Sequence, residues 1–135
     1  MTLNLRVLAP DKSVYDGSAD EVILPSTTGQ LGILTGHVSM LTALDSGVLR
    51  LREGGNWQSI ALSGGFAEVE ANEVTVLVNA AELGSNIDAA TAASDFEAAQ
   101  QAAAAFEGQA PSPDKVKAQQ ELARTRARLQ AAKGS

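Results

Sequence analysis

The sequence lacks several residue types on which whole classes of function depend. It contains no cysteine, which excludes disulfides, thiolate nucleophiles and thiolate metal sites. It contains one histidine, His37, so a histidine-rich metal site is also excluded. No apolar run approaches the roughly 18 residues typical of a membrane span. Residues 1–6 lack a basic region followed by an apolar run, so we expect no secretory signal and a soluble intracellular protein.

What the chain does contain changes near Gly84. Residues 1–84 hold ten of the twelve glycines and most of the β-branched and aromatic side chains. Residues 85–135 hold sixteen alanines and only two glycines. Glycine-punctuated β-branched stretches favour strands and turns, whereas alanine favours helices. The composition therefore predicts a β domain over residues 1–84 and a helical region over residues 85–135.

Short apolar stretches separated by turn residues recur along the first 84 residues. Such spacing is typical of a sandwich or barrel, because a single sheet would leave one apolar face in water. We expect an all-β sandwich of about ten short antiparallel strands in two sheets. Gly64-Gly65 falls between two of the expected strands and indicates a tight bend or bulge.

The C-terminal region has the pattern of two antiparallel helices, over about 87–106 and 113–132. Ser85-Asn86-Ile87-Asp88 resembles a capping box, and Ser112-Pro113 resembles a second helix start. Gly108 is expected to terminate the first helix. The inner stripe of the second helix is expected to comprise Ala118, Leu122, Thr125, Leu129 and Ala132.

This hairpin is expected to be a movable arm. Its apolar faces consist mainly of alanine, which removes little area from water on docking. Its charge also differs from that of the body. Residues 114–135 carry six basic and two acidic groups, a net of +4, whereas residues 1–113 carry four basic and fourteen acidic groups, a net of −10. The basic segment can therefore dock on the body or on an acidic partner.

Five segments of the first 88 residues form an ordered series. They are residues 22–34 (VILPSTTGQLGIL), 36–37 (GH), 44–50 (LDSGVLR), 64–69 (GGFAEV) and 72–78 (NEVTVLV). In order and spacing this series resembles the epsilon subunit of F-type ATP synthase, especially the cyanobacterial and chloroplast type. The resemblance implies a ten-stranded sandwich followed by two helices, with no catalytic activity and no cofactor.

The resemblance also implies partners and a location. Such a subunit lies on the rotor stalk between the gamma subunit and the ring of c subunits, and is a monomer when isolated. Its helices can lie folded on the sandwich or extend along gamma toward the catalytic beta subunit, where they inhibit ATP hydrolysis. The chain would then be peripheral on the cytoplasmic, stromal-type side of an energy-transducing membrane, the thylakoid, without inserting into it.

Two stretches of the expected sandwich acquire roles by this resemblance. Gly29, Gln30, Leu31 and Gly32 would form a loop that contacts the c ring, although relatives often have a glutamate where this chain has Gln30. Without a partner the same stretch is simply a turn. His37 would lie near the gamma-facing side. From the residues alone, it equally satisfies the backbone of a turn.

Three arginines on the second helix, Arg124, Arg126 and Arg128, are candidates for an inhibitory contact. In the resembling family, basic residues here meet an acidic stretch of the beta subunit. The alternative is a solvated face with intrahelical pairs such as Lys117–Glu121. Nucleic acid is not an expected partner, because the patch lacks aromatics for base stacking and the acidic body repels phosphate.

Nucleotide binding is the main departure from the family pattern. Some bacterial relatives bind ATP through an Ile-Asp-x-x-Arg-Ala motif that opens the first helix. Here the corresponding residues are Ile87-Asp88-Ala89-Ala90-Thr91-Ala92, and Ala98 takes the place of a second arginine. Without guanidinium groups a phosphate loses its charge-assisted hydrogen bonds, so we expect no tight ATP site.

Two other classes of function compete with a rotor subunit. One is a free-standing sandwich that binds a small ligand, with helices that mediate oligomerisation. The other is a hydrolase on a β scaffold, which needs converging acid and base groups. The acidic residues of the sandwich instead look like solvated strand positions; they are Asp20, Glu21, Glu68, Glu70 and Glu73.

Overall fold

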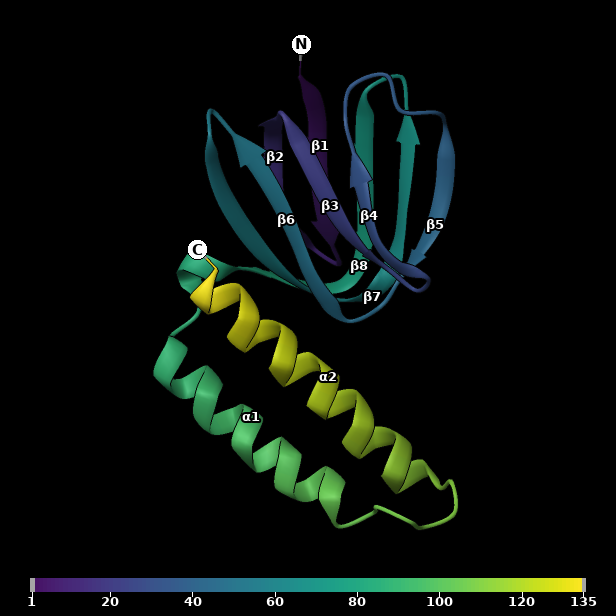
Figure 1. Ribbon diagram of the computed structural model, residues 1–135, viewed down its shortest axis with the longest axis vertical. Helices are drawn as coiled ribbons and strands as arrows, with labels where there is room; N and C mark the ends of the chain where they lie inside the picture. The colour runs from purple at the N-terminus through teal and green to yellow at the C-terminus, as the bar shows by residue number, and fades with distance from the viewer. Residues whose placement is uncertain (1, 135) are drawn as a thin grey trace.

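The computed structural model describes residues 2–134, which form a β-sandwich followed by a helical hairpin (Figure 1). The strands are β1 (Leu3–Ala9), β2 (Lys12–Ala19), β3 (Glu21–Ser26), β4 (Gly29–Ile33), β5 (Met40–Leu44), β6 (Gly47–Glu53), β7 (Asn56–Glu70) and β8 (Glu73–Leu83). A 3-10 turn, η1 (Gly84–Asn86), leads to α1 (Ala89–Ala104) and α2 (Pro113–Lys133). Within residues 2–134, neither helix is long and apolar enough to cross a membrane.

The sandwich has eight strands within the described residues, not about ten. One strand of the difference arises at Gly64-Gly65, where the sequence indicates two strands but the structure has one bent strand of 15 residues, β7. One edge of β7 pairs with β6 before the bend, with Leu62 opposite Gly47. The same edge pairs with β5 after it, with Gly65 opposite Leu44. The predicted bend is confirmed, and it allows β7 to run through both layers of the sandwich.

The strand pairs are antiparallel except one. β1 lies parallel to β8, with Leu5 opposite Val74 and Val7 opposite Val76. The expectation of wholly antiparallel sheets is therefore wrong for this pair. A parallel partner needs a long connection, and here the connection is the rest of the sandwich.

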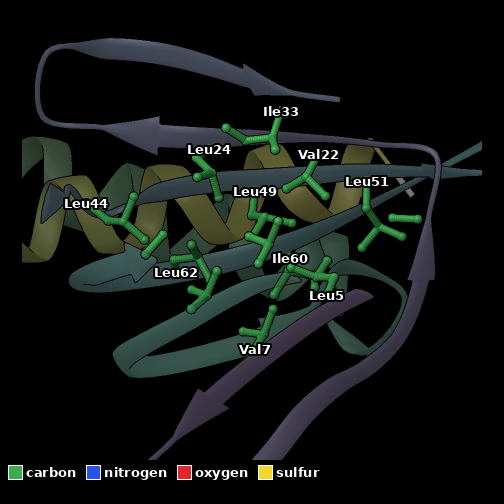
Figure 2. Packing of buried hydrophobic residues seen from close by; sticks show 14 of the residues in the cluster. Leu5, Val7, Val22, Leu24, Ile33, Leu44, Leu49, Leu51, Ile60 and Leu62 are labelled. Atoms are coloured by element: carbon green, nitrogen blue, oxygen red, sulfur yellow. The ribbon is translucent and has the colours of Figure 1, made fainter. Parts of the chain in front are cut away.

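The core lies between the two layers and is made almost entirely of aliphatic side chains (Figure 2). It follows from the alternation along each strand: in β1 the residues Leu3, Leu5 and Val7 are fully buried and their neighbours face outward. The same alternation places Val74 and Val76 of β8 inside. This buried cluster includes no residue of either helix.

The helices begin and end slightly differently from the sequence expectation. Ser112 caps α2 as predicted, accepting a hydrogen bond from Lys115 N at 3.1 Å. Asp88 is itself the cap of α1, so the capping box starting at Ser85 is wrong, because Ser85 lies in η1. α1 ends at Ala104, before Gly108, which lies in the turn with φ +78°.

Candidate functional site

The interface between the hairpin and the sandwich is the structural feature that bears most directly on function. In Figure 1, α2 lies against the sandwich and α1 lies on the far side of α2. α2 contacts β6, β7 and η1, whereas α1 packs mainly on α2. Releasing α2 would therefore free both helices.

The apolar part of this interface is small and rich in alanine. It forms a cluster of its own, separate from the sandwich core. The buried members are Ala61, Ile87, Ala92, Ala127 and Ala131, with Val48, Leu129 and Ala132 packed against them. The predicted α2 stripe includes Leu129 and Ala132 of this cluster but omits Ala127 and Ala131, the two α2 residues that are buried in it.

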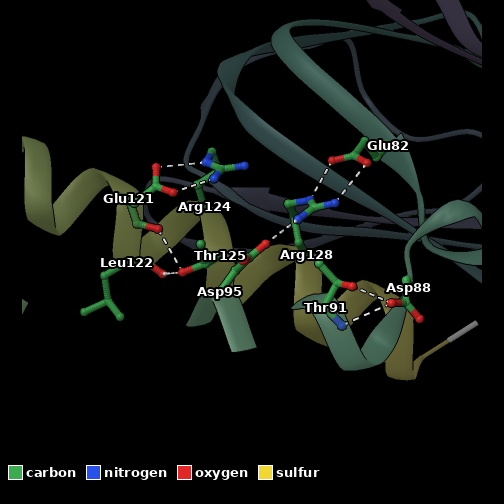
Figure 3. A network of polar contacts seen from close by, with 9 residues as sticks. All are labelled: Glu82, Asp88, Thr91, Asp95, Glu121, Leu122, Arg124, Thr125 and Arg128. Carbon is green, nitrogen blue, oxygen red and sulfur yellow. Dashed lines mark hydrogen bonds and ion pairs between the residues drawn. The ribbon is translucent and has the colours of Figure 1, made fainter. Parts of the chain in front are cut away.

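Arg128 connects three elements through its guanidinium group (Figure 3). Its Nε donates to Glu82 Oε1 of β8 at 2.7 Å, and its Nη2 donates to Glu82 Oε2 at 3.4 Å. Its Nη1 lies 3.5 Å from Asp95 Oδ2 of α1. The Arg128 side chain is 20 % exposed, against 42 % for Glu82 and 46 % for Asp95. The alternative of a solvated arginine face therefore does not hold for Arg128, and its predicted inhibitory contact stays a prediction.

The other two predicted arginines have different surroundings. Arg124 pairs with Glu121 within α2, and this hydrogen bond raises the pKa of Arg124 and lowers that of Glu121. Glu121 thus takes Arg124 as its hydrogen-bonded partner, in place of the expected pair with Lys117. Arg126 is exposed, with its guanidinium carbon 5.7 Å from the centre of the Phe96 ring of α1.

Thr125 is a buried polar residue in the middle of α2. Its hydroxyl bonds to the carbonyls of Glu121 at 2.9 Å and Leu122 at 3.1 Å (Figure 3). The hydroxyl is therefore satisfied within its own helix.

Asp88 holds the first turn of α1. Its carboxylate accepts hydrogen bonds from Thr91 N at 3.2 Å and from the Thr91 hydroxyl (Figure 3). These hydrogen bonds lower the pKa of Asp88. Thr91, which replaces the arginine of the nucleotide-binding pattern, thus bonds to Asp88. The absence of a tight ATP site stays a prediction.

We expect the helicity of the hairpin to fall in acid because Asp88 is protonated. A carboxylate whose pKa is lowered by folding stabilises the folded form at pH values above its pKa in the unfolded chain, about 3.9. That contribution is lost as the pH falls through the lower folded value. Far-UV circular dichroism should show a smaller acid loss in Asp88→Asn, which keeps a capping oxygen. The pKa of Glu121 is lowered as well, so Glu121→Gln should be introduced both into the protein that keeps Asp88 and into the Asp88→Asn variant. An unchanged acid loss would exclude Asp88 as its source.

The residues predicted to contact the c ring form a strand, not a loop. Gly29, Gln30, Leu31 and Gly32 belong to β4, with Gln30 opposite Pro25 of β3. The turn itself is Thr27-Thr28, which lies next to the end of β5 because Thr27 N donates to Ala43 O. Gln30 is exposed and Leu31 is partly buried. The ring contact itself stays a prediction.

His37 lies in the connection between β4 and β5. Its backbone N donates to Leu34 O at 3.1 Å, and its ring Nδ1 donates to Val38 O at 2.8 Å. Gly36 N donates to Asn72 Oδ1 at 2.7 Å, which ties this connection to the β7–β8 turn. The side chain therefore does satisfy turn backbone groups, and a gamma contact stays a prediction.

The outer face of the sandwich has an exposed apolar row, formed by Leu41, Phe66 and Leu77. This row is absent from the sequence predictions. Phe66 of β7 is paired with Leu77 of β8 on one side and with Ala43 of β5 on the other. Leu41 lies two residues before Ala43 in β5 and therefore on the same face of the sheet. Phe66 is 53 % exposed and Leu41 71 %. The signal was present, since strands that bury Val76 and Ala67 must turn Leu77 and Phe66 outward.

The acidic and histidine side chains of the described residues do not gather into a metal centre. Among residues 2–134, no group of three or more histidine, aspartate or glutamate side chains could hold a metal ion. Asp20 and Glu21 both lie next to Arg52, as surface ion pairs at 3.8 and 3.4 Å.

Comparison with known proteins identifies the family. The model "ATP synthase, Delta/Epsilon chain, beta-sandwich domain" matches residues 2–84. The model "ATP synthase, Delta/Epsilon chain, long alpha-helix domain" matches residues 85–133. The ATP synthase epsilon chain of Synechococcus sp. (strain CC9902) is 70 % identical over 135 residues, covering 100 % of this chain and 99 % of that protein. That of Prochlorococcus marinus (strain MIT 9313) is 64 % identical over 133 residues, covering 98 % and 100 %.

Solved structures show the same fold. A chain of the Euglena gracilis mitochondrial ATP synthase, OSCP/F1/c-ring, aligns with a TM-score of 0.78 at 24 % identity, covering 97 % of this chain and 81 % of that chain. This likeness concerns the fold, whereas the identity to the cyanobacterial proteins concerns the family. The chain therefore belongs to the ATP synthase delta/epsilon family, as a non-catalytic subunit of the epsilon type.

Proposed function

We propose that this chain links the gamma subunit to the c ring in the rotor stalk and inhibits ATP hydrolysis through its C-terminal helices. The observation that carries the proposal is the contrast between the two parts of the molecule. The sandwich has a continuous aliphatic core, whereas the hairpin is docked by a separate, alanine-rich cluster. The sandwich can thus serve as a fixed base while the hairpin changes position.

The energetics of docking support this contrast. Full burial of a large aliphatic side chain contributes about 1.5–3 kcal/mol, and the hairpin cluster has few such side chains. Ordering the helices on the sandwich opposes docking. The net free energy of docking would then be about a few kcal/mol. A partner that binds the undocked helices with a similar free energy would release the hairpin. Alanine keeps each helix favourable when it is undocked.

Three surfaces fit three partners of such a stalk. The apolar row of Leu41, Phe66 and Leu77 suits gamma, because an exposed apolar surface of this kind indicates a protein interface. The β3–β4 end, with Gln30, suits the polar loops of the c ring. Arg124, Arg126 and Arg128 suit an acidic stretch of the beta subunit. The proposed complex lies on the thylakoid membrane, a proposal that the 70 % identity to a cyanobacterial epsilon chain supports.

The proposal is tested by removing residues 88–135 and rebuilding the synthase with the remaining sandwich. ATP hydrolysis by the rebuilt complex is expected to rise several-fold, since the inhibitory helices are absent. Assembly with gamma and the c ring should be unchanged, because the sandwich core does not include the hairpin cluster. Steady-state hydrolysis and co-purification measure the two effects. Equal inhibition by the truncated and full-length chains would exclude the hairpin as the inhibitor.

A further inference from the structure

Arg128 forms the one ion pair between the hairpin and the sandwich among residues 2–134. The remaining ion pairs of these residues lie within the sandwich, within α2, or between α1 and α2. The guanidinium of Arg128 faces both oxygens of Glu82 on β8 and also Asp95 on α1 (Figure 3). One side chain of α2 thus joins α2 to the other two parts of the molecule.

The same side chain belongs to the basic face assigned to an acidic partner. A guanidinium presents its donors in a fixed planar fork, and a carboxylate from any chain fits that fork equally well. Glu82 and Asp95 therefore occupy in the docked hairpin the positions that two carboxylates of a partner would take. Arg128 cannot bind both sets at the same time.

We propose that Arg128 is a latch that works by carboxylate exchange: an acidic protein segment that captures Arg128 from Glu82 and Asp95 releases the hairpin from the sandwich. This inference rests on the proposed function for the identity of the partner, but the latch itself is a property of the isolated chain. Release and capture then become one event, because the group that holds the hairpin down is the group that the partner binds.

Arg124 provides a matched control on the same helix. It lies one turn before Arg128, carries the same charge and is bonded to Glu121 within α2. Replacing Arg124 removes a positive charge from α2 without removing a bond to the sandwich. A comparison of Arg128→Gln with Arg124→Gln therefore separates the latch from a general effect of charge.

The latch is tested first in the isolated full-length chain by hydrogen exchange. Arg128→Gln is expected to accelerate amide exchange throughout α1 and α2 by about tenfold, the factor that corresponds to about 1.4 kcal/mol. Glu82→Gln should act similarly, and the double variant should add little, since the two residues share one interaction. Arg124→Gln should change exchange less than about twofold. Equal acceleration by Arg124→Gln and Arg128→Gln, or none by either, would overturn the latch.

Exchange of carboxylates is tested in the rebuilt synthase, where two variants that both loosen docking should act in opposite directions. Glu82→Gln with Asp95→Asn frees Arg128 for the partner and is expected to lower ATP hydrolysis by up to about tenfold. Arg128→Gln frees the hairpin but removes the captured group, and is expected to raise hydrolysis. If both variants lowered hydrolysis equally, Arg128 would hold the hairpin without exchanging partners.

The two tests also separate this inference from the proposed function. If removal of residues 88–135 left hydrolysis unchanged, the inhibitory function would fail, yet the exchange rates of the isolated chain would still report on the latch. If removal raised hydrolysis but Arg128→Gln left α1 and α2 protected in the isolated chain, the function would stand and the latch would fail.

Discussion

Replacing Gly65 with alanine is expected to destabilise the sandwich by roughly 3–5 kcal/mol, a large part of the stability of a domain of this size. A Cβ on Gly65 would lie 2.1 Å from Leu77 O and 2.8 Å from Val78 Cα, both on the backbone of β8. Backbone atoms of a paired strand cannot rotate aside as a side chain can. The change would therefore separate β7 from β8 at the bend that lets β7 serve both layers.

Gly32→Ala is the matched control for Gly65→Ala. Gly32 is also a strand glycine, but beyond its own chain neighbours no heavy atom lies within 4 Å of the position that a Cβ would take. The change should therefore stay within about 0.5 kcal/mol. Trp57, the single tryptophan, lies on β7 and has the Arg50 guanidinium 4.8 Å from its ring centre. Its fluorescence during urea unfolding should report both variants. Equal midpoints for the two would exclude the close approach to β8 as a constraint.

Replacing Phe66 with aspartate is expected to weaken binding of the chain to gamma by about 30-fold to 1000-fold. Phe66 is central in the apolar row, flanked by Leu77 and Ala43. Loss of an aromatic anchor at an interface costs about 2–4 kcal/mol, and each 1.4 kcal/mol is tenfold. A carboxylate there would also be desolvated without a partner. Calorimetric titration of purified gamma into the chain measures the effect.

Val116→Asp is the control for that experiment. Val116 is 46 % exposed, close to the 53 % of Phe66, but lies on α2 away from the apolar row. Val116→Asp introduces one negative charge, as Phe66→Asp does, so any general effect of charge appears in both variants. Hydrogen exchange of the β strands should show that both proteins remain folded. Equal loss of affinity in the two variants, or none in Phe66→Asp, would remove the apolar row as the gamma surface.

Much of the fold can be predicted from local patterns. The change from glycine to alanine and the cap at Ser112 each depend on neighbouring residues. The predicted order of a sandwich followed by two helices and the predicted cap are both confirmed. The bend at Gly64-Gly65 was also predicted, but not that the strand continues through it. Continuity depends on β8, which pairs with β7 on both sides of the bend.

What could not be predicted depends on residues far apart in sequence. Arg128 has the sequence context of a solvated helix arginine, and its partner Glu82 lies on a strand 46 residues earlier. Ala127 and Ala131 are buried because α2 packs on the sheet. The helical period of the sequence does not distinguish them from the other alanines, so their burial could not be predicted. The outward orientation of Phe66 can be predicted from strand alternation alone. That Phe66 belongs to an apolar row cannot, because the row depends on which residues lie opposite Phe66 on the neighbouring strands.

The parallel pairing of β1 with β8 has a consequence for synthesis of the chain. Arg6 and Thr75, which face each other in this pair, are separated by 69 residues. A chain emerging from the ribosome therefore carries β1 with one edge unpaired until almost the whole sandwich has been made. Non-local pairing of this kind slows folding. The helices follow the strands in the chain, so the whole sandwich is synthesised before either helix.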